Sequence, residues 1–205
     1  RCDLTLMISE PEIKLLHEQF GLPLEQLVYL PFIIDPAQLQ TGLDYEQRQH
    51  LMMIGGFKHE PNRDATRWLK QEIWPLLKAQ LPADCEMHVY GAYADHAMNQ
   101  LHNPKQRFHI KGRVDDALST LGQYRLNLAP LRFGAGQKGK ILEGWLTGTP
   151  TITTPIGAEA MATDEQLGYT TTNNADEFAR LTAQAYTQPE QWQTLQENGH
   201  RLLLN

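Results

Sequence analysis

The sequence has few cysteines and no cluster of basic residues. Cys2 and Cys85 are the only cysteines among 205 residues, too few and too far apart for a disulfide framework or a structural zinc site. Two unpaired thiols are typical of a reducing compartment, so we expect a cytoplasmic protein. The net charge is -6, with no run of lysine or arginine and no series of base-stacking aromatics. This argues against nucleic acid or an anionic membrane as the main partner.

Long apolar runs are also missing, and so are several well-known loops. The longest apolar runs have the length of a strand, too short for a membrane-spanning helix. No G-x-G-x-x-G follows the first strand of the regular part, and GAGQKGK lacks the Lys-Ser/Thr pair of a Walker A loop. No G-x-S-x-G is present. These absences argue against three functions: NAD or FAD binding, ATP hydrolysis, and hydrolysis by a Ser-His-Asp triad.

The eight histidines show no metal-binding spacing. His59, His88, His96, His102 and His109 form no i, i+4 pair within one helix and have no nearby cysteine pair. We therefore expect scattered surface or strand histidines, no bound metal and no cofactor.

From Leu51 onward, short apolar strands alternate with helices. We expect strands at 51–55, 86–91, 107–112, 125–130, 149–154 and 168–172, and helices beginning near 62, 95, 117, 139, 174 and 189. This alternation predicts an α/β fold, a doubly wound, Rossmann-like parallel sheet with helices on both faces. Ligands of such sheets bind at the carboxyl ends of the strands. Gly55, Gly91, Gly112 and Gly134 lie at or just past such ends, which suggests backbone held close to a ligand.

The first part of the chain has a different pattern. Leu4–Ser9 is expected to be a buried strand. Ser9 is the expected cap of a short helix that ends before Gly21. The segment LVYLPFIID then reads as an extended connection, and the polar residues 38–49 read as a loop or linker.

These patterns divide the chain in two. Residues 1–50 are expected to close an amino-terminal domain and form a linker, and residues 51–205 are expected to form a ligand-binding domain. The chain starts on Arg1 and opens directly into an apolar run, so we expect a piece of a longer polypeptide.

One strand-to-helix connection, RFGAGQKGKILEG, combines glycines, lysines and a carboxylate. Gly134 and Gly136 allow a tight turn, and the start of the following helix offers free amides and a partial positive charge to an anion. Lys138 and Lys140 add formal charge there. Glu143 would repel a phosphate unless it accepts hydrogen bonds from neighbouring hydroxyls, such as those of a ribose. The connection therefore predicts a nucleoside diphosphate site.

Three segments resemble a known family in order and spacing. IGGFKHEPNRDATRWLKQEIWPLL, HIKGRVDDALSTLGQYRLNLAPL and APLRFGAGQKGKILEGWLTGTPTITTPIGAE are similar to the carboxyl-terminal, donor-binding domain of retaining glycosyltransferases of family 4, which have the GT-B fold. The resemblance covers nearly everything from Leu51 to the end. CDLTLMISEPEIKLL is similar to the segment that closes the family's amino-terminal domain.

The resemblance implies an enzyme that moves a sugar from a nucleoside-diphosphate sugar to an acceptor, with retention at the anomeric carbon and without a metal. The acceptor, and any membrane contact, would belong mainly to an amino-terminal domain that this chain largely lacks. The chain by itself is then expected to be inactive. A role in polysaccharide biosynthesis is implied by the family alone.

The resemblance also implies roles for the residues of the connection. Glu143 matches the second glutamate of the family's motif, which holds the ribose. Ala135 stands where the first glutamate, which meets the donor sugar, is usually found. Backbone amides of Gly136, Gln137 and Lys138 are our candidates for holding the sugar hydroxyls.

In the loop that contains Gly55, the sequence departs from many relatives. Gly56 stands in place of an arginine and Asn62 roughly in place of a lysine. The leaving diphosphate is then expected to be stabilised mainly by Lys138. Further candidates for this role are Lys58 and Lys140, with Arg132 a weaker one.

The base is expected near GRVDD. Main-chain groups of Val114 would read its edge and Arg113 would flank its face. Asp115 and Asp116 are expected to cap a helix and not to bind a metal.

Two alternatives remain open at this stage. One is a sugar-nucleotide 2-epimerase of the same fold, and the other is a non-catalytic nucleotide-binding or interaction module. A glycosidase is disfavoured, because Glu143 has no obvious carboxylate partner at the same edge.

Overall fold

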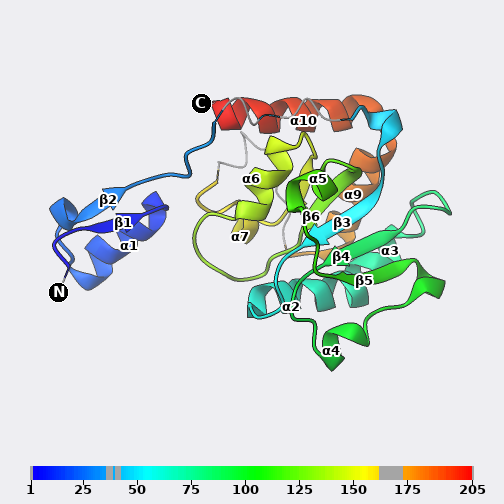
Figure 1. Cartoon of the computed structure of the whole chain (residues 1–205), viewed down its shortest axis with the longest axis horizontal. Helices are drawn as coiled ribbons and strands as arrows, with labels where there is room; N and C mark the ends of the chain where they lie inside the picture. Colours follow the sequence, from blue (N-terminus) through cyan, green and yellow to red (C-terminus); the bar gives the residue numbers. More distant parts are fainter. Residues whose placement is uncertain (1, 36–38, 40–42, 162–172, 205) are drawn as a thin grey trace.

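The computed structural model describes residues 2–35, 39, 43–161 and 173–204 (Figure 1). The strand expected at 168–172 lies outside the described residues. The main body is a five-stranded parallel sheet in the order β5-β4-β3-β6-β7. Its strands are β3 (Gln49–Ile54), β4 (Met87–Tyr90), β5 (Phe108–Gly112), β6 (Tyr124–Ala129) and β7 (Thr151–Thr153). The five strands expected at these positions are confirmed.

Helices cover both faces of the sheet, which confirms the doubly wound, Rossmann-like arrangement (Figure 1). They are α2 (Glu60–Trp68), α3 (Trp74–Leu77), α4 (His96–Asn99), α5 (Ala117–Leu121), α6 (Gly139–Leu146), α7 (Pro155–Ala158), α9 (Ala175–Thr187) and α10 (Pro189–Leu204). The apolar side chains of α2, α3 and α9 form one large core with Leu51 and Met53 of β3. On the other face, Leu121 of α5 packs on Met52 and Tyr124.

The strand order places a topological switch point between β3 and β6. The chain leaves β3 toward β4 and β5, and it leaves β6 toward β7. Parallel sheets of this kind bind ligands in the crevice outside the carboxyl ends of the strands at such a point. The loops after β3 and β6 therefore position the candidate site.

A proline distorts the helix that follows β3. α2 continues through a wide π-type turn, Leu69–Ile73, into α3. Trp74 donates its backbone N–H to the carbonyl oxygen of Leu69, five residues back, immediately before Pro75. Proline has no N–H and crowds the preceding turn, so an irregularity is expected at this point and is observed.

The first residues form a separate small unit. β1 (Thr5–Met7) pairs in parallel with β2 (Leu27–Tyr29), and α1 (Glu10–Phe20) connects them. As expected, the Ser9 side chain accepts from the amide of Glu12, and Gly21 ends the helix with a φ of 67°.

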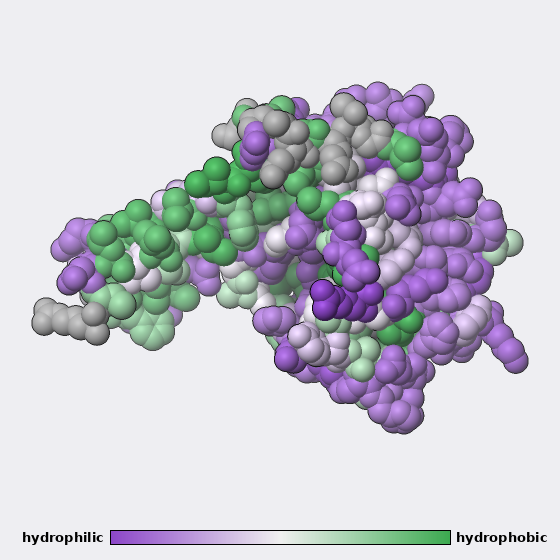
Figure 2. Space-filling view, viewed as in Figure 1, coloured by the Kyte–Doolittle hydropathy of each residue, from purple (hydrophilic) through white to green (hydrophobic). Residues whose placement is uncertain are grey.

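The expectation that the first strand is buried is wrong. Leu4 is 59% exposed and Leu6 is 62% exposed, because no further strand or helix of the described chain covers them. Figures 1 and 2 show this unit standing out from the main body with apolar side chains on its surface. The described residues contain no helix that could serve as a membrane span.

The end of the segment expected to be a linker packs against the main body. Arg48 is fully buried and donates to Thr149 Oγ1 at 2.6 Å and to the carbonyl oxygen of Thr147 at 2.9 Å. The Tyr45 hydroxyl donates to the carbonyl oxygen of Tyr186 at 2.8 Å. Residues from Leu43 onward therefore contribute to the fold that positions the site.

Candidate functional site

Asn62 joins the two loops at the switch point. Its amide nitrogen donates to the carbonyl oxygen of Gly56 at 2.9 Å, and its amide oxygen accepts from Nζ of Lys140 at the start of α6. A Cβ atom on Gly55 would lie 2.6 Å from Cγ of Asn62, so only glycine leaves room for this side chain. The loop after β3 is thereby held against the first turn of α6.

The start of α6 offers free backbone donors. Lys138 occupies the cap position and gives no side-chain cap hydrogen bond. Among the described residues, the amides of Gly139 and Lys140 have no acceptor. Gly134 and Gly136 precede them with φ values of 122° and 71°, in a region that glycine enters without strain. This turn leaves the amides available to an anion.

Lys138 lies inside the loop and not on its surface. Its Nζ donates to the carbonyl oxygen of Gly136, and only 9% of the residue is exposed. Burial lowers the pKa of Lys138, and the carboxylates of Glu159 and Glu12 oppose this shift. Its positive charge therefore stands close to the free amides but is partly used by the loop itself.

Lys140 and Glu143 of α6 influence each other's charge. Burial lowers the pKa of Lys140 to about 8, against the opposing effect of Glu143. Burial also raises the pKa of Glu143, which Lys140 opposes. Among the described residues, the Glu143 carboxylate accepts no hydrogen bond and is only partly exposed. A carboxylate without such a partner, one turn from free amides, can accept hydrogen bonds from ligand hydroxyls.

A hollow lies at the carboxyl ends of β4 and β5. It has a volume of about 670 Å³ and is lined by Tyr93, Gly112 and Arg113, among others. Arg113 is exposed at its edge, with Val114 next in the chain. Nζ of Lys58 lies 3.9 Å from the ring centre of Tyr93, so this lysine stacks on the aromatic ring. Of the residues expected around the base, Arg113 lines this hollow.

Internal packing explains two of the four glycines at strand ends. A Cβ atom on Gly91 would lie 2.5 Å from the carbonyl oxygen of Gly55 and 2.7 Å from the ring of Phe57. Gly55 is required by Asn62, as described above. By contrast, an added Cβ on Gly56 would meet no atom within 4 Å.

The sequence of the main body matches the family described as glycosyl transferases group 1 over residues 48–188. This match covers more than half of the chain. The chain belongs to this family. No curated protein matches it.

Solved structures of glycosyltransferases have the same fold. A mutant of S. aureus TarM, in complex with fondaparinux, α-GlcNAc-glycerol and UDP, superposes with a TM-score of 0.81 at 13% identity, over 98% of this chain and 40% of that chain. The pneumococcal O-GlcNAc transferase GtfA, in complex with UDP and GlcNAc, gives 0.74 at 18% identity, over 98% and 42%. WaaG, a glycosyltransferase involved in lipopolysaccharide biosynthesis, gives 0.72 at 18% identity, over 98% and 58%. The chain thus spans about half the length of these GT-B enzymes.

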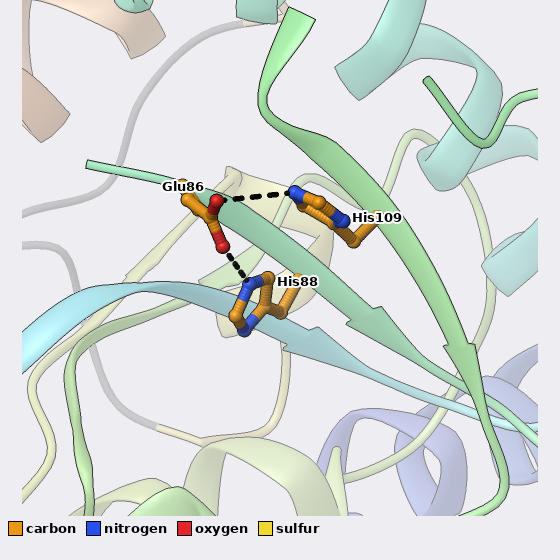
Figure 3. Close-up of side chains that lie close together, drawn as sticks. All are labelled: Glu86, His88 and His109. Atoms are coloured by element: carbon orange, nitrogen blue, oxygen red, sulfur yellow. Dashed lines mark hydrogen bonds and ion pairs between the residues drawn. The ribbon is translucent and has the colours of Figure 1, made fainter. Parts of the chain in front are cut away.

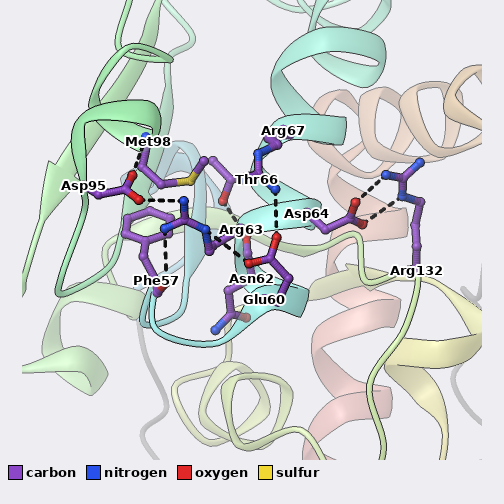
Figure 4. A network of polar contacts seen from close by, with 10 residues as sticks. All are labelled: Phe57, Glu60, Asn62, Arg63, Asp64, Thr66, Arg67, Asp95, Met98 and Arg132. Atoms are coloured by element: carbon purple, nitrogen blue, oxygen red, sulfur yellow. Dashed lines mark hydrogen bonds and ion pairs between the residues drawn. The ribbon is translucent and has the colours of Figure 1, made fainter.

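Ion pairs hold the helix after β3 in place (Figure 4). Arg132 donates to Asp64 of α2 through Nε at 2.9 Å and through Nη2 at 2.5 Å. Arg63 donates to Asp95 at 2.7 Å. Arg132 is therefore committed to α2, which leaves it a poor candidate for binding phosphate.

Two other expectations can be compared with the structure directly. Asp116 caps α5 by accepting from the amide of Ser119 at 3.0 Å, as expected. The side-chain amide of Gln137 donates to the carbonyl oxygen of Ala160 at 3.0 Å, which leaves its backbone amide as the group that could face a ligand.

Two groupings of side chains were not predicted from the sequence. One is the contact between Asn62 and Lys140, since Asn62 had been considered only as a substitute for a lysine. The other is a cluster of Glu86, His88 and His109 on β4 and β5 (Figure 3). His88 and His109 lie on strands, as expected, but they are not scattered, because the parallel register places His88 beside His109.

Proposed function

We propose that this chain holds the nucleoside-diphosphate sugar of a glycosyltransferase that transfers the sugar to an acceptor with retention of configuration. The observation that carries the proposal is the uncapped start of α6 at the switch point, with Lys138, Lys140 and Glu143 around it. The structures named above support it, since two of them contain UDP.

The diphosphate would lie against the amides of α6 and the turn at Gly134 and Gly136. Lys138 and Lys140 would stabilise the negative charge that develops on it as the bond to the sugar breaks. The helix end and the lysines would do here what a metal ion does elsewhere, so the transfer we propose is metal-independent. The sugar hydroxyls would be held by main-chain amides at Gly136 and Gln137.

The nucleoside would extend from α6 toward β5. Glu143 would accept from the ribose hydroxyls and so fix the position of the donor. Val114 and Arg113 would contact the base at the hollow beside β5. Lys58 and the unobstructed backbone of Gly56 would lie along the same edge.

The acceptor would bind mainly to a further, amino-terminal domain. The small unit of β1, α1 and β2, with the residues that directly follow it, supports this, because many of their apolar side chains are exposed: Leu4, Leu6, Phe20, Leu24, Phe32 and Ile33. Large exposed apolar patches mark interaction surfaces. By this proposal the chain alone binds the donor weakly, transfers nothing, and contacts a membrane only through the other domain. The reaction would take place in the cytoplasm.

Calorimetric titration with UDP, GDP and ADP tests the donor site. We expect one nucleotide to bind, and we expect Lys138→Ala and Glu143→Ala each to weaken it about tenfold, as loss of a charge-assisted hydrogen bond does. Lys105→Ala is the matched control: Lys105 lies in the short 3-10 helix Pro104–Gln106, which is not part of the proposed donor site. No heat with any nucleotide, from folded protein, would favour a non-catalytic module.

Transfer and epimerisation can be separated by following the donor sugar. Robust transfer by this chain alone, to any acceptor, would contradict the proposal that the acceptor binds mainly to another domain. Exchange of the C2 proton of a bound nucleotide-sugar with solvent would indicate a 2-epimerase instead.

A further inference from the structure

A cluster of potential metal ligands lies at the end of the sheet opposite to the donor site. His88 is the second residue of β4, His109 is the second residue of β5, and Glu86 directly precedes β4. The parallel register pairs His88 with His109, so both side chains project from the same face. Figure 3 shows the three side chains converging there.

The distances within the cluster suit a single ion. Oε2 of Glu86 lies 2.7 Å from Nε2 of His88, and Oε1 of Glu86 lies 3.4 Å from Nε2 of His109. One ligand atom from each residue lies within 4.8 Å of the other two. Bonds of about 2.0 Å in a tetrahedral zinc site place neighbouring ligand atoms about 3.3 Å apart. Small side-chain rotations are therefore enough to bring all three atoms onto one ion.

One polar atom of the cluster lacks a hydrogen-bond partner among the described residues. This atom is Nε2 of His109, which is buried. Its approach to Glu86 lacks the geometry of a hydrogen bond, although the two atoms are 3.4 Å apart. Buried polar atoms are rarely left unpaired, and an unpaired one often marks an ion that is not seen.

The surroundings already orient the ring of His88. Nδ1 of His88 lies 2.6 Å from the hydroxyl oxygen of Tyr124, which itself lies 2.8 Å from the hydroxyl oxygen of Tyr90. The backbone amide of Glu86 donates to Nδ1 of His50 at 3.2 Å. The Tyr124 hydroxyl fixes the His88 ring and leaves its Nε2 directed to the metal. The Glu86 side chain is 35% exposed, so an ion can reach the cluster from solvent.

We propose that Glu86, His88 and His109 bind a divalent transition-metal ion, with zinc as the best fit. Two imidazole nitrogens and one carboxylate favour zinc over magnesium or calcium, which prefer oxygen ligands. Water would complete the coordination. The ion would bind β4 to β5 at their amino ends, far from α6, and so would stabilise the sheet. The proposed transfer would remain independent of it.

Titration of the EDTA-treated and dialysed chain with zinc chloride tests this proposal. We expect one equivalent to bind by calorimetry and to raise the unfolding temperature. Cobalt(II) in place of zinc should give the intense visible absorption of a four-coordinate site. His109→Gln should weaken zinc binding by about tenfold or more, the loss seen when ligation is disturbed.

Control variants distinguish a specific metal site from non-specific zinc binding. His96→Gln removes a histidine outside the cluster, on α4, and should bind zinc like the original chain. His88→Gln removes the most buried ligand and could unfold the chain, so His109→Gln is the decisive variant. UDP titration of His109→Gln should be unchanged, which separates this proposal from the proposed function. Absence of stoichiometric zinc binding, or equal weakening in His96→Gln and His109→Gln, would overturn it.

Discussion

Nζ of Lys140 donates to the side-chain oxygen of Asn62, and burial lowers the pKa of Lys140 to about 8 against the opposing effect of Glu143. Its charge in the free chain is therefore lost as the pH rises above about 8. Because a bound diphosphate favours the protonated lysine, we expect the dissociation constant of UDP to rise by up to about tenfold per pH unit above this value. Calorimetry between about pH 7 and about pH 9.5 measures the slope.

Arginine at the same position gives the control. Lys140→Arg keeps its charge throughout this range, so most of the loss of affinity should vanish. Equal slopes in both proteins would assign the effect to another group.

The stability of the free chain should change with pH in the opposite direction, because Lys140 loses its proton more easily in the folded chain than in the unfolded one. The unfolded chain keeps this proton up to about pH 10.5, so the free energy of unfolding should rise between about pH 8 and about pH 10.5.

Gly55 and Gly56 are adjacent but differ in the space around them. A Cβ on Gly55 would collide with Asn62, whereas a Cβ on Gly56 would meet nothing within 4 Å. We expect Gly55→Ala to lower the free energy of unfolding by about 1–3 kcal/mol, the usual cost of overpacking, and Gly56→Ala to change it little. Urea denaturation compares the two variants. If Gly55→Ala proves as stable as Gly56→Ala, Asn62 does not have the fixed position described above.

Among the elements, the segment before β3 depends on one buried side chain. Arg48 donates to Leu43, Thr147 and Thr149, and burial lowers its pKa to about 10, so it stays charged at neutral pH. Arg48→Met would leave buried acceptors unpaired, and we expect a loss of about 3 kcal/mol of stability. Arg67→Met, which removes an exposed ion pair with Glu60, should cost less than about 1 kcal/mol. Equal losses in urea denaturation would contradict this role for Arg48.

Element boundaries were predictable where local signals are strong. α6 runs over Gly139–Leu146, as the sequence predicted, because glycines before it and an apolar stripe within it define both ends. α2 begins at Glu60, two residues before the predicted start at Asn62. Pro61 lies in its first turn, where the missing N–H of proline costs nothing, so the helix can include it.

At the scale of the whole molecule, the small amino-terminal unit exposes apolar side chains that the main body does not cover. We expect the full chain to self-associate as its concentration rises, and a chain of residues 43–205 to remain folded and monomeric. Size-exclusion chromatography with light scattering, together with circular dichroism, measures both. Equal self-association of the two chains would show that the interacting surface lies on residues 43–205 and not on the amino-terminal unit.

The sequence alone determined the alternation of strands and helices, the glycine- and lysine-rich turn before α6, and the family resemblance. All three depend on neighbouring residues, whose periodicity, turn chemistry and spacing are local properties. The tertiary structure alone decided the strand order, and with it the switch point between β3 and β6. It also brought Asn62 to Lys140 and His88 to His109. Such contacts depend on how distant segments pack together, which no local pattern specifies.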